Sequence, residues 1–312
     1  MNIIRPTTER SLPANPTAVA IGNFDGMHLG HQRILSFLAH RASEDALKPV
    51  ILTFSPHPGK VTGGGHIRLL QTEEQKLAKI ERFGGDTVYI LPFDRDLGRL
   101  SAEDFVRDIL IERLNCHVIV VGEDFRFGRD REGDTTRLHE LAHRFALTVY
   151  PVPSLLKEGV PVSSSVIRDL IRNGEVARAA VLLGETYEIR GRIVSGQTVG
   201  RGLGFPTANL ETGNEVVPAG VFVTTTEVAG GFHASVTNVG TRPTFNRTGT
   251  HIETHILDFT QDIYGADISL RFLEKIRDEL RFESPDDLRE QISEDLGTTR
   301  RYFVLHPLPP SP

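Results

Sequence analysis

The sequence of 312 residues contains one cysteine and no tryptophan. The single cysteine, Cys116, excludes an intramolecular disulfide and any metal site built from several cysteine ligands, and it favours a reducing compartment. No apolar run approaches the roughly 18 residues of a membrane span, and charges and prolines interrupt the N-terminal segment. These absences predict a cytoplasmic protein with no membrane partner.

The chain also lacks an excess of basic residues. Its 35 lysines and arginines against 41 acidic residues give a net charge of −6, which argues against nucleic acid as a partner. Residues 1–184 carry 23 basic and 23 acidic side chains, whereas residues 185–312 carry 12 and 18. The second part therefore supplies the whole charge, and the length, at about 150 residues per domain, favours two domains.

In the first part, short apolar runs alternate with amphipathic stretches, which predicts a parallel sheet with helical crossovers. A helix is expected from about Leu29, and a second follows Ser101, whose spacing from Asp104 is typical of a helix N-cap. This second helix is expected to bury Phe105, Ile109 and Leu114. The fold class is an α/β domain of the Rossmann type, with strands expected at residues 17–22, 50–54, 87–91, 117–122 and 147–152.

After Gly184 the pattern changes to β-rich segments separated by glycine, proline and asparagine turns, which predicts an antiparallel sheet or small barrel. One helix is expected to close the chain, with Ser284 as its N-cap, Pro285 as its first residue and an apolar face. The expected domains are residues 1–184 and 185–312. The segments are 187–194, 220–226, 232–239, 251–259 and 266–276, and the apolar face comprises Leu288, Ile292 and Leu296.

The segment GNFDGMHLGH, residues 22–31, follows the first expected strand and leads into a helix. A glycine-rich turn of this kind presents backbone N–H groups and the positive end of a helix, which suit a phosphate. His28 and His31 lie three residues apart, so both imidazoles can point toward the same anion. The same spacing would also fit a metal pair or two ordinary surface histidines.

The longer string GNFDGMHLGHQ resembles the adenylyltransferase half of bacterial bifunctional riboflavin kinase/FAD synthetases, within the nucleotidylyltransferase superfamily. TFSPHP (53–58), VVGEDFRFGRDREGD (120–134) and VSSSVIR (162–168) match in the same order. The first two follow strands, and the last is expected to precede a helix. The resemblance implies that the phosphate of FMN attacks the α-phosphorus of ATP, so that FAD forms and pyrophosphate leaves without a covalent enzyme intermediate.

The resemblance assigns His28, His31 and Arg168 as the catalytic residues of this half. The histidines would hold ATP phosphates, and Ser163, Ser164 and Arg168 would clamp the phosphates from the opposite side, because arginine offers a fixed fork of donors. Val166 stands where relatives often have a polar or basic residue. Further ATP contacts are expected at Gly22, Asn23, Asp25 and Gly30.

Other residues of this half keep more than one interpretation. Phe54, Pro56 and Pro58 could form an apolar wall for the isoalloxazine or only a rigid loop. Asp25 and Asp124 could hold magnesium, accept from a ribose or orient a base, and Asp124, where relatives often have asparagine, is placed with the flavin contacts. The arginines of one charged loop could form a phosphate lid, although a solvated loop is favoured: Arg126, Arg129 and Arg131.

In the second part, GRGLGFPTANL, VPAGVFV, VTNVGTRPTF and HIETHILDFTQDIYG resemble the flavokinase domain, a six-stranded Greek-key barrel. The resemblance implies phosphorylation of riboflavin by ATP, with Thr207 and Asn209 as magnesium ligands. Glu253 would be the general base for the ribityl 5′-hydroxyl. Strand alternation puts Glu253 on a face with His255, Leu257 and Phe259, which predicts partial burial and a raised pKa.

The remaining contacts of this half follow from the same resemblance. Gly200, Arg201 and Gly202 are expected at the ATP phosphates, and Phe205 at the flavin. Arg277 and Glu279 fall where the family closes over the flavin ring, but they could equally be a solvated charge cluster.

The two resemblances together predict a bifunctional enzyme that makes FMN from riboflavin and then FAD from FMN. ATP is the expected co-substrate and Mg²⁺ the expected cofactor, with riboflavin, FMN and FAD as ligands. A homo-oligomer is possible but does not follow from the sequence. Two alternatives remain: adenylylation of another substrate, such as nicotinamide mononucleotide or pantetheine phosphate, and a flavin-binding sensor without turnover.

Overall fold

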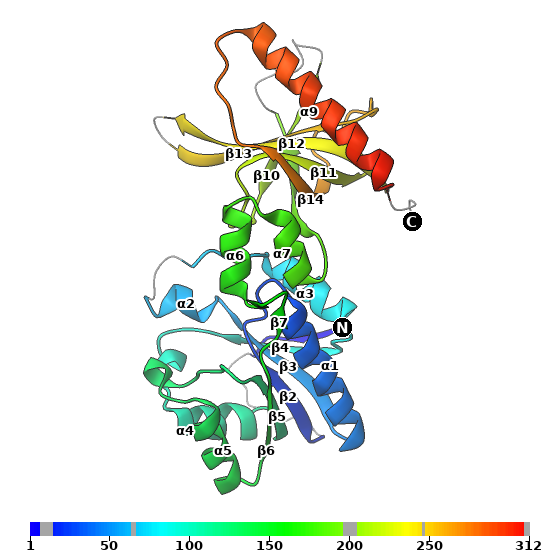
Figure 1. Ribbon diagram of the computed structural model, residues 1–312. Coiled ribbons are helices and arrows are strands. Elements are labelled where there is room, and N and C mark those ends of the chain that lie inside the picture. The colour runs from blue at the N-terminus through cyan, green and yellow to red at the C-terminus, as the bar shows by residue number, and fades with distance from the viewer. Residues whose placement is uncertain (7–14, 64–66, 196–204, 245–246, 309–312) are drawn as a thin grey trace. The chain divides into compact units, whose positions relative to one another are not determined.

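The computed structural model describes residues 1–6, 15–63, 67–195, 205–244 and 247–308 (Figure 1). Its internal contacts divide the chain into two compact units. The first unit comprises residues 1–69 and 73–163, and the second comprises residues 70–72 and 164–312.

The first unit is built on a six-stranded parallel sheet in the order β1-β4-β3-β2-β5-β6. Its central strand β2 lies between β3 and β5, so the strand order reverses there. All five strands expected from the apolar runs are confirmed, and a short edge strand, β1, is added beside β4. The bounds are β1 Asn2–Ile4, β2 Thr17–Ile21, β3 Lys48–Ser55, β4 Thr87–Pro92, β5 Cys116–Gly122 and β6 Thr148–Val152.

Helices cover both faces of this sheet because alternate residues of each strand point to opposite sides. Ala18 and Ala20 of β2 pack in one core, with residues of α1 and α3. Val19 and Ile21 pack in the other, with α4, the π-helical segment η2 and α5. The bounds are α1 Leu29–Glu44, α2 Pro58–Val61, α3 Glu73–Arg82, η1 Leu97–Arg99, α4 Ala102–Asp104, η2 Phe105–Ile111, η3 Arg129–Arg131 and α5 Thr135–Arg144, with a hairpin of β7 Leu156–Lys157 and β8 Val160–Pro161.

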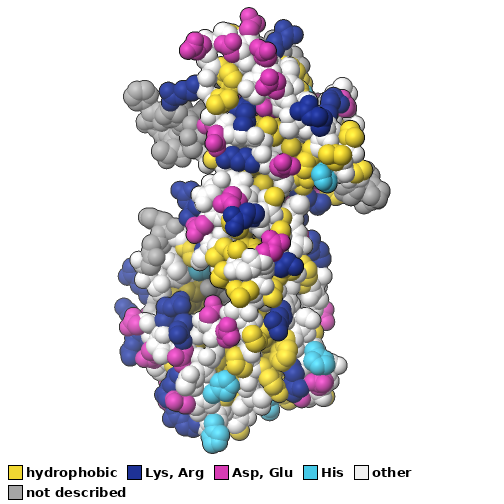
Figure 2. All heavy atoms as spheres, viewed as in Figure 1, with side chains coloured by type: hydrophobic (Ala, Val, Ile, Leu, Met, Phe, Trp, Pro, Cys, Tyr) yellow, Lys and Arg dark blue, Asp and Glu magenta, His cyan; other side chains and the backbone are white. Residues whose placement is uncertain are grey.

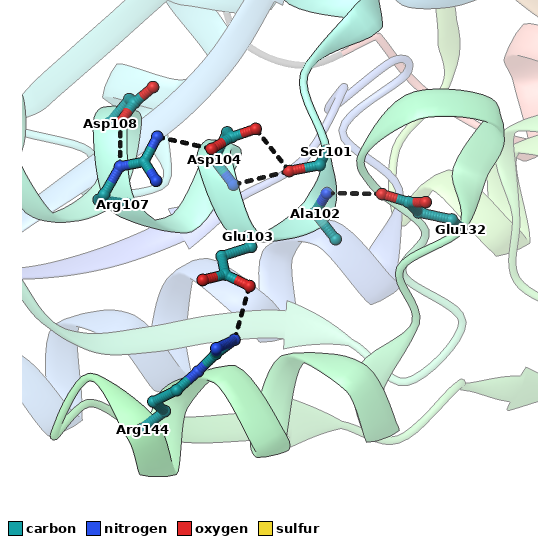
Figure 3. Close-up of polar contacts among 8 residues, drawn as sticks. All are labelled: Ser101, Ala102, Glu103, Asp104, Arg107, Asp108, Glu132 and Arg144. Atoms are coloured by element: carbon teal, nitrogen blue, oxygen red, sulfur yellow. Dashed lines mark hydrogen bonds and ion pairs between the residues drawn. The ribbon is translucent and has the colours of Figure 1, made fainter.

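The helix expected after Ser101 is present as α4 and η2. The Ser101 hydroxyl accepts from the Asp104 N–H at 3.1 Å and donates to the Asp104 carboxylate at 2.6 Å (Figure 3). The side chains expected to be buried are buried: Phe105, Ile109 and Leu114. The N-cap and the apolar spacing together therefore located this helix correctly.

The second unit contains a closed barrel in the order β10-β13-β12-β11-β14-β9, and every neighbouring pair is antiparallel. Phe222 and Phe272 pack edge to face inside it at a ring separation of 5.3 Å. Beside them, the hydroxyls of buried threonines and serine bond to one another, so their polar groups are satisfied without water. The bounds are β9 Tyr187–Val194, β10 Ala208–Thr212, β11 Gly220–Val228, β12 Gly231–Thr244, β13 Arg247–Ile256 and β14 Asp267–Arg277.

Among its described residues, the second unit contains the helices α6 (Ser164–Arg172), α7 (Val176–Leu183) and α9 (Pro285–Leu305). Helix α7 packs against β14 and β9, and α9 packs against β12. The expected N-cap of α9 is confirmed, with a capping box between Ser284 and Asp287. The expectation that VSSSVIR precedes a helix was wrong, because α6 already begins at Ser164.

The surface agrees with the division of charge along the chain. Acidic and basic side chains are interspersed over the visible face of both units, and acidic ones gather over the first half of α9 (Figure 2). That half carries Asp286, Asp287, Glu290 and Glu294. Among the helices of the described ranges, none is long and apolar enough to cross a membrane.

Candidate active sites

The loop after β2 holds the two expected histidines at the start of α1. Two of its residues, Phe24 and Met27, have φ angles of 51° and 47° although neither is glycine, and both are fully buried. A strained backbone that is held by its own buried side chains is a recurring feature of functional loops. The loop is therefore fixed by packing, and it delivers the histidines in one orientation.

His28 caps α1, because its Nδ1 accepts the backbone N–H of His31 at 3.3 Å. The two imidazole rings stack with centroids 3.6 Å apart and an angle of 17° between their planes. A Cβ on Gly30 would lie 3.2 Å from the His28 ring, so the glycine leaves room for this stack. The two rings therefore lie together, whereas their common contact with an anion stays a prediction.

Burial sets the charge of one of the two rings. The Nδ1 of His28 accepts the hydrogen bond that caps α1. Burial, and then the proximity of His28 and Lys76, lowers the pKa of His31 well below 6.5. The Nδ1 of His31 is buried and has no hydrogen-bond partner in the described part of the chain. His31 thus offers hydrogen bonds rather than positive charge.

A lysine that the sequence reasoning missed lies between this loop and the end of β3. The Lys76 ammonium donates to Thr53 Oγ1 at 3.2 Å and to the Phe54 carbonyl at 3.4 Å. The Thr53 hydroxyl in turn donates to the Asn23 carbonyl at 3.3 Å. Lys76 precedes the buried Ile80 of α3 by four residues, and this helical spacing was the available signal that its side chain points inward.

The carboxyl ends of β2, β3 and β5 carry three of the four matched segments. In an open parallel sheet this edge, at the point where the strand order reverses, is where ligands bind. Asp25 of the first segment is 4% exposed. Asp124 of the β5 segment is exposed, and one of its carboxylate oxygens lies 2.9 Å from the position of a Cβ on Gly122. The fold thus brings the segments to one edge, whereas the role of each carboxylate stays a prediction.

The arginine loop after β5 is tied to the start of α4. Glu132 accepts the Ala102 N–H at 2.8 Å, as Figure 3 shows, and the Arg129 N–H donates to the Leu100 carbonyl at 2.7 Å. Arg126 forms an ion pair with Asp134 at 3.2 Å. These contacts favour the interpretation as an anchored, solvated loop over that of a moving lid.

The segment VSSSVIR lies at the boundary of the two units. Ser163 ends the first unit, whereas Ser164 and Arg168 belong to the second. Arg168 is 8% exposed, and its guanidinium donates to the Ser165 hydroxyl at 3.4 Å. The binding of ATP phosphates by Ser163, Ser164 and Arg168 therefore stays a prediction.

In the barrel, Glu253 stands in a row of polar side chains across three strands. It lies opposite Asn209 of β10 and opposite Asn238 of β12, so all three side chains point to the same side of the sheet. The Oδ1 atoms of both asparagines are buried and have no hydrogen-bond partner in the part of the chain that is described. Unsatisfied oxygens beside a carboxylate are suited to a cation or a donor group.

A second unforeseen residue, His251, contacts the Glu253 carboxylate through Nε2 in a short hydrogen bond. The two residues lie two apart on β13 and hence share a face. The expectation that Leu257 and Phe259 continue this face was wrong, because β13 ends at Ile256. Glu253 instead faces away from the inward row of Ile252, Thr254 and Ile256.

Several of the other residues expected at the flavin contact neighbouring protein groups. Arg277 donates to the buried carboxylate of Asp295 in α9, at 2.8 Å from its Nη2, and Glu279 packs against Gly240. Phe205 lies edge to face with His255 at 6.1 Å.

In the α/β unit, Phe54 packs edge to face against Phe93 at 5.8 Å, and Pro56 is exposed beside Phe54. Gly200, Arg201 and Gly202 lie outside the described residues, whereas Thr207 and Pro58 lie within them.

A parallel sheet with paired histidines at its ligand edge, joined to a barrel with a carboxylate among amide oxygens, defines a two-domain enzyme of phosphate-group transfer. The FAD synthetase family model matches residues 11–166, and the riboflavin kinase family model matches residues 183–303. Most of α6 and α7 falls between the two matches, so the expected boundary at residue 184 stays a prediction.

Curated relatives match the chain over nearly its whole length. The bifunctional riboflavin kinase/FMN adenylyltransferase of Haemophilus influenzae is 34% identical over 307 residues, covering 97% of this chain and 99% of its own. The enzyme of the same description from Escherichia coli is 36% identical over 299 residues, covering 94% and 95%. The chain belongs to the family of bifunctional riboflavin kinase/FMN adenylyltransferases.

Among solved structures, one from Streptococcus pneumoniae described as a macrolide-efflux protein matches the chain with a TM-score of 0.87 and 31% identity. The match covers 96% of this chain and 99% of that one. Both the α/β domain and the barrel are therefore shared in full with a known structure. As a member of its family, the chain is a bifunctional enzyme with an FAD synthetase domain followed by a riboflavin kinase domain.

Proposed function

We propose that the two activities act in sequence on one flavin, riboflavin kinase in the barrel and FMN adenylyltransferase at the edge of the parallel sheet. The observation that carries the proposal is the chemical difference between the two sites. One offers two stacked imidazoles in the glycine-rich loop after β2, and the other offers a carboxylate flanked by amide oxygens. Adenylylation of a phosphate and phosphorylation of a hydroxyl need these different groups.

In the adenylyl transfer, an oxygen of the FMN phosphate attacks the α-phosphorus of ATP. The bond from that phosphorus to the bridging oxygen breaks, and pyrophosphate leaves with the electron pair. The attacking phosphate is already an anion, so that no base is required, and the protein contributes position and hydrogen bonds. We assign His28 and His31 to the phosphates, with Ser163, Ser164 and Arg168 as further donors.

In the kinase reaction, a neutral hydroxyl must lose its proton as it attacks the γ-phosphorus. Glu253 takes the proton of the ribityl 5′-hydroxyl, and ADP leaves. His251 fixes one oxygen of the Glu253 carboxylate, so it restricts the rotation of the base.

Magnesium fits the barrel site because the Asn209 Oδ1 is a buried hard oxygen without a protein partner in the described ranges. Asn209 and Thr207 would hold the ion, which when bound neutralises phosphate charge. The flavin contacts assigned by resemblance, Phe205 in the barrel and Phe54 beside β3, stay part of the proposal.

A chromatographic product assay tests the proposal. Full-length protein with ATP and Mg²⁺ is expected to convert riboflavin to FMN and then FAD, and to convert supplied FMN to FAD. A folded sample that forms neither product would overturn it. A sample that forms FAD when FMN is supplied, but not when riboflavin is supplied, would overturn the kinase half alone.

A further inference from the structure

Lys76 is a partly buried cation at the end of β3, near the loop that follows β2. Its ammonium is bonded to Thr53 and to the Phe54 carbonyl at the end of β3. Through the Thr53 hydroxyl it is connected to Asn23, in the loop that carries the histidines. Both direct acceptors are neutral oxygens, so these bonds position the charge without cancelling it.

The histidine pair leaves a charge requirement that it does not meet. ATP carries several negative charges at neutral pH, and burial keeps His31 uncharged. Two imidazolium rings 3.6 Å apart would also repel each other strongly. Besides Arg168, which is assigned to the phosphates above, further positive charge must therefore come from a group near the loop.

Lys76 is electrostatically coupled to that loop. The Lys76 cation is one of the causes that lower the pKa of His31. Burial lowers the pKa of Lys76, while Glu73 and Asp25 raise it. Glu73 is also hydrogen-bonded to Arg5 at 2.7 Å, so its negative charge is shared with a second cation.

We infer that Lys76 is a further phosphate-site residue of the adenylyltransferase, whose ammonium supplies the positive charge at the loop that holds His28 and His31. It stabilises the charge that grows on pyrophosphate as the bond to the α-phosphorus breaks, and it moves no proton. A preorganised charge in a water-poor site acts strongly because it needs no reorganisation during the reaction. The inference rests on the proposed adenylyl transfer at this edge.

The alternative is that Lys76 only ties two loops together. Lys76→Met keeps the apolar stem and removes the charge, whereas Lys76→Arg keeps the charge. Lys48→Met, at the exposed start of β3, is the matched control. Circular dichroism and the thermal unfolding of the full-length protein report that the α/β unit of each variant is folded, and riboflavin kinase activity reports on the barrel.

For Lys76→Met we expect FAD formation from FMN to fall about 100-fold, with kinase activity unchanged, and Lys76→Arg to recover at least a tenth of the wild-type rate. In a calorimetric titration with pyrophosphate, Lys76→Met should bind more weakly and with a shallower dependence on ionic strength. A loop tether alone would leave that dependence unchanged.

Three results separate the inference from the proposed function. The role of Lys76 would be overturned if Lys76→Met formed FAD from FMN at the wild-type rate, or if Lys76→Arg formed it no faster than Lys76→Met. An unchanged salt dependence of pyrophosphate binding would overturn it as well. A wild-type protein that forms no FAD from FMN would instead overturn the proposed adenylyltransferase, and the pyrophosphate titration would still decide on Lys76.

Discussion

The two units place their reactive groups on opposite kinds of scaffold. In the α/β unit the candidate groups lie at the carboxyl ends of parallel strands, where loops of different strands converge, and its two histidines lie on a strained loop. The barrel uses the face of neighbouring antiparallel strands, where Asn209, Glu253 and Asn238 stand in register. The difference follows the chemistry, because an anionic nucleophile needs donors and charge, whereas a hydroxyl nucleophile needs a base.

The largest separation of the two activities is expected on substitution of Glu253. Glu253→Gln keeps the shape of the side chain and removes the base, so that FMN formation should fall by about 10²–10⁴-fold, while FAD formation from FMN stays unchanged. Product chromatography with each substrate measures both rates. The exposed Glu274→Gln on β14 is the control, and equal loss in both reactions would contradict two separate sites.

The reverse separation is expected for His28→Ala. Removing the imidazole that caps α1 and is assigned to the ATP phosphates should lower FAD formation from FMN by about 10²–10³-fold and leave riboflavin phosphorylation intact. The exposed His40→Ala, on the same helix, should leave both rates unchanged. A loss of kinase activity in a folded His28→Ala sample would contradict the division of labour.

Arg277 tests whether the barrel unit uses its arginine for structure or for the flavin. Arg277→Ala leaves the carboxylate of Asp295, only 4% exposed, without its cationic partner, which should cost about 3–5 kcal/mol of unfolding free energy. Denaturant unfolding measures the loss, with Arg281→Ala as the exposed control. A raised KM for riboflavin at unchanged stability would instead favour the flavin contact expected from the sequence.

A smaller effect is expected at His251, which contacts the base but not the transferred group. His251→Ala frees the Glu253 carboxylate to rotate, so that kcat for FMN formation should fall about tenfold, less than the roughly 10²–10⁴-fold expected on loss of the base itself, with KM for ATP unchanged. Steady-state kinetics with riboflavin measure the two constants. An unaltered kcat would show that His251 does not position the base.

The smallest expected effect is the pH dependence of the stability of the first unit. The folded-state pKa of His31 lies below its unfolded value near 6.5, so the unfolded chain binds more protons below that pH. Its contribution to stability is therefore present at pH 7 and decreases as the pH falls below 6.5. Denaturant unfolding at pH 7 and pH 5 measures the difference, which His31→Gln should reduce; an equal difference in that variant would contradict the assignment.

The fold was largely predictable because apolar residues repeat at different intervals in strands and in helices, and both units follow these intervals closely. The parallel strands appear in the sequence as apolar runs, and the N-caps Ser101 and Ser284 marked two helices. Strand β10 was missed because it emerges from a glycine-rich segment, and β1 because three exposed residues give no pattern.

The motifs named candidate residues but not their environment. They point to His28, His31 and Glu253, yet a motif does not show that the two histidine rings stack. Asn238 faces Glu253 only through strand register, which depends on pairing between distant segments. Lys76 and His251 had weaker local signals, the helical spacing to Ile80 and the two-residue spacing to Glu253.

The central claim is that one chain holds two independent reactions in series on one flavin. The most direct test mixes equal amounts of Glu253→Gln and His28→Ala with riboflavin, ATP and Mg²⁺ and follows FMN and FAD by chromatography. Each variant alone should fail to make FAD from riboflavin, and the mixture should make it, because His28→Ala supplies FMN that Glu253→Gln adenylylates. A mixture that forms no FAD, although each variant retains its expected single activity, would contradict the account.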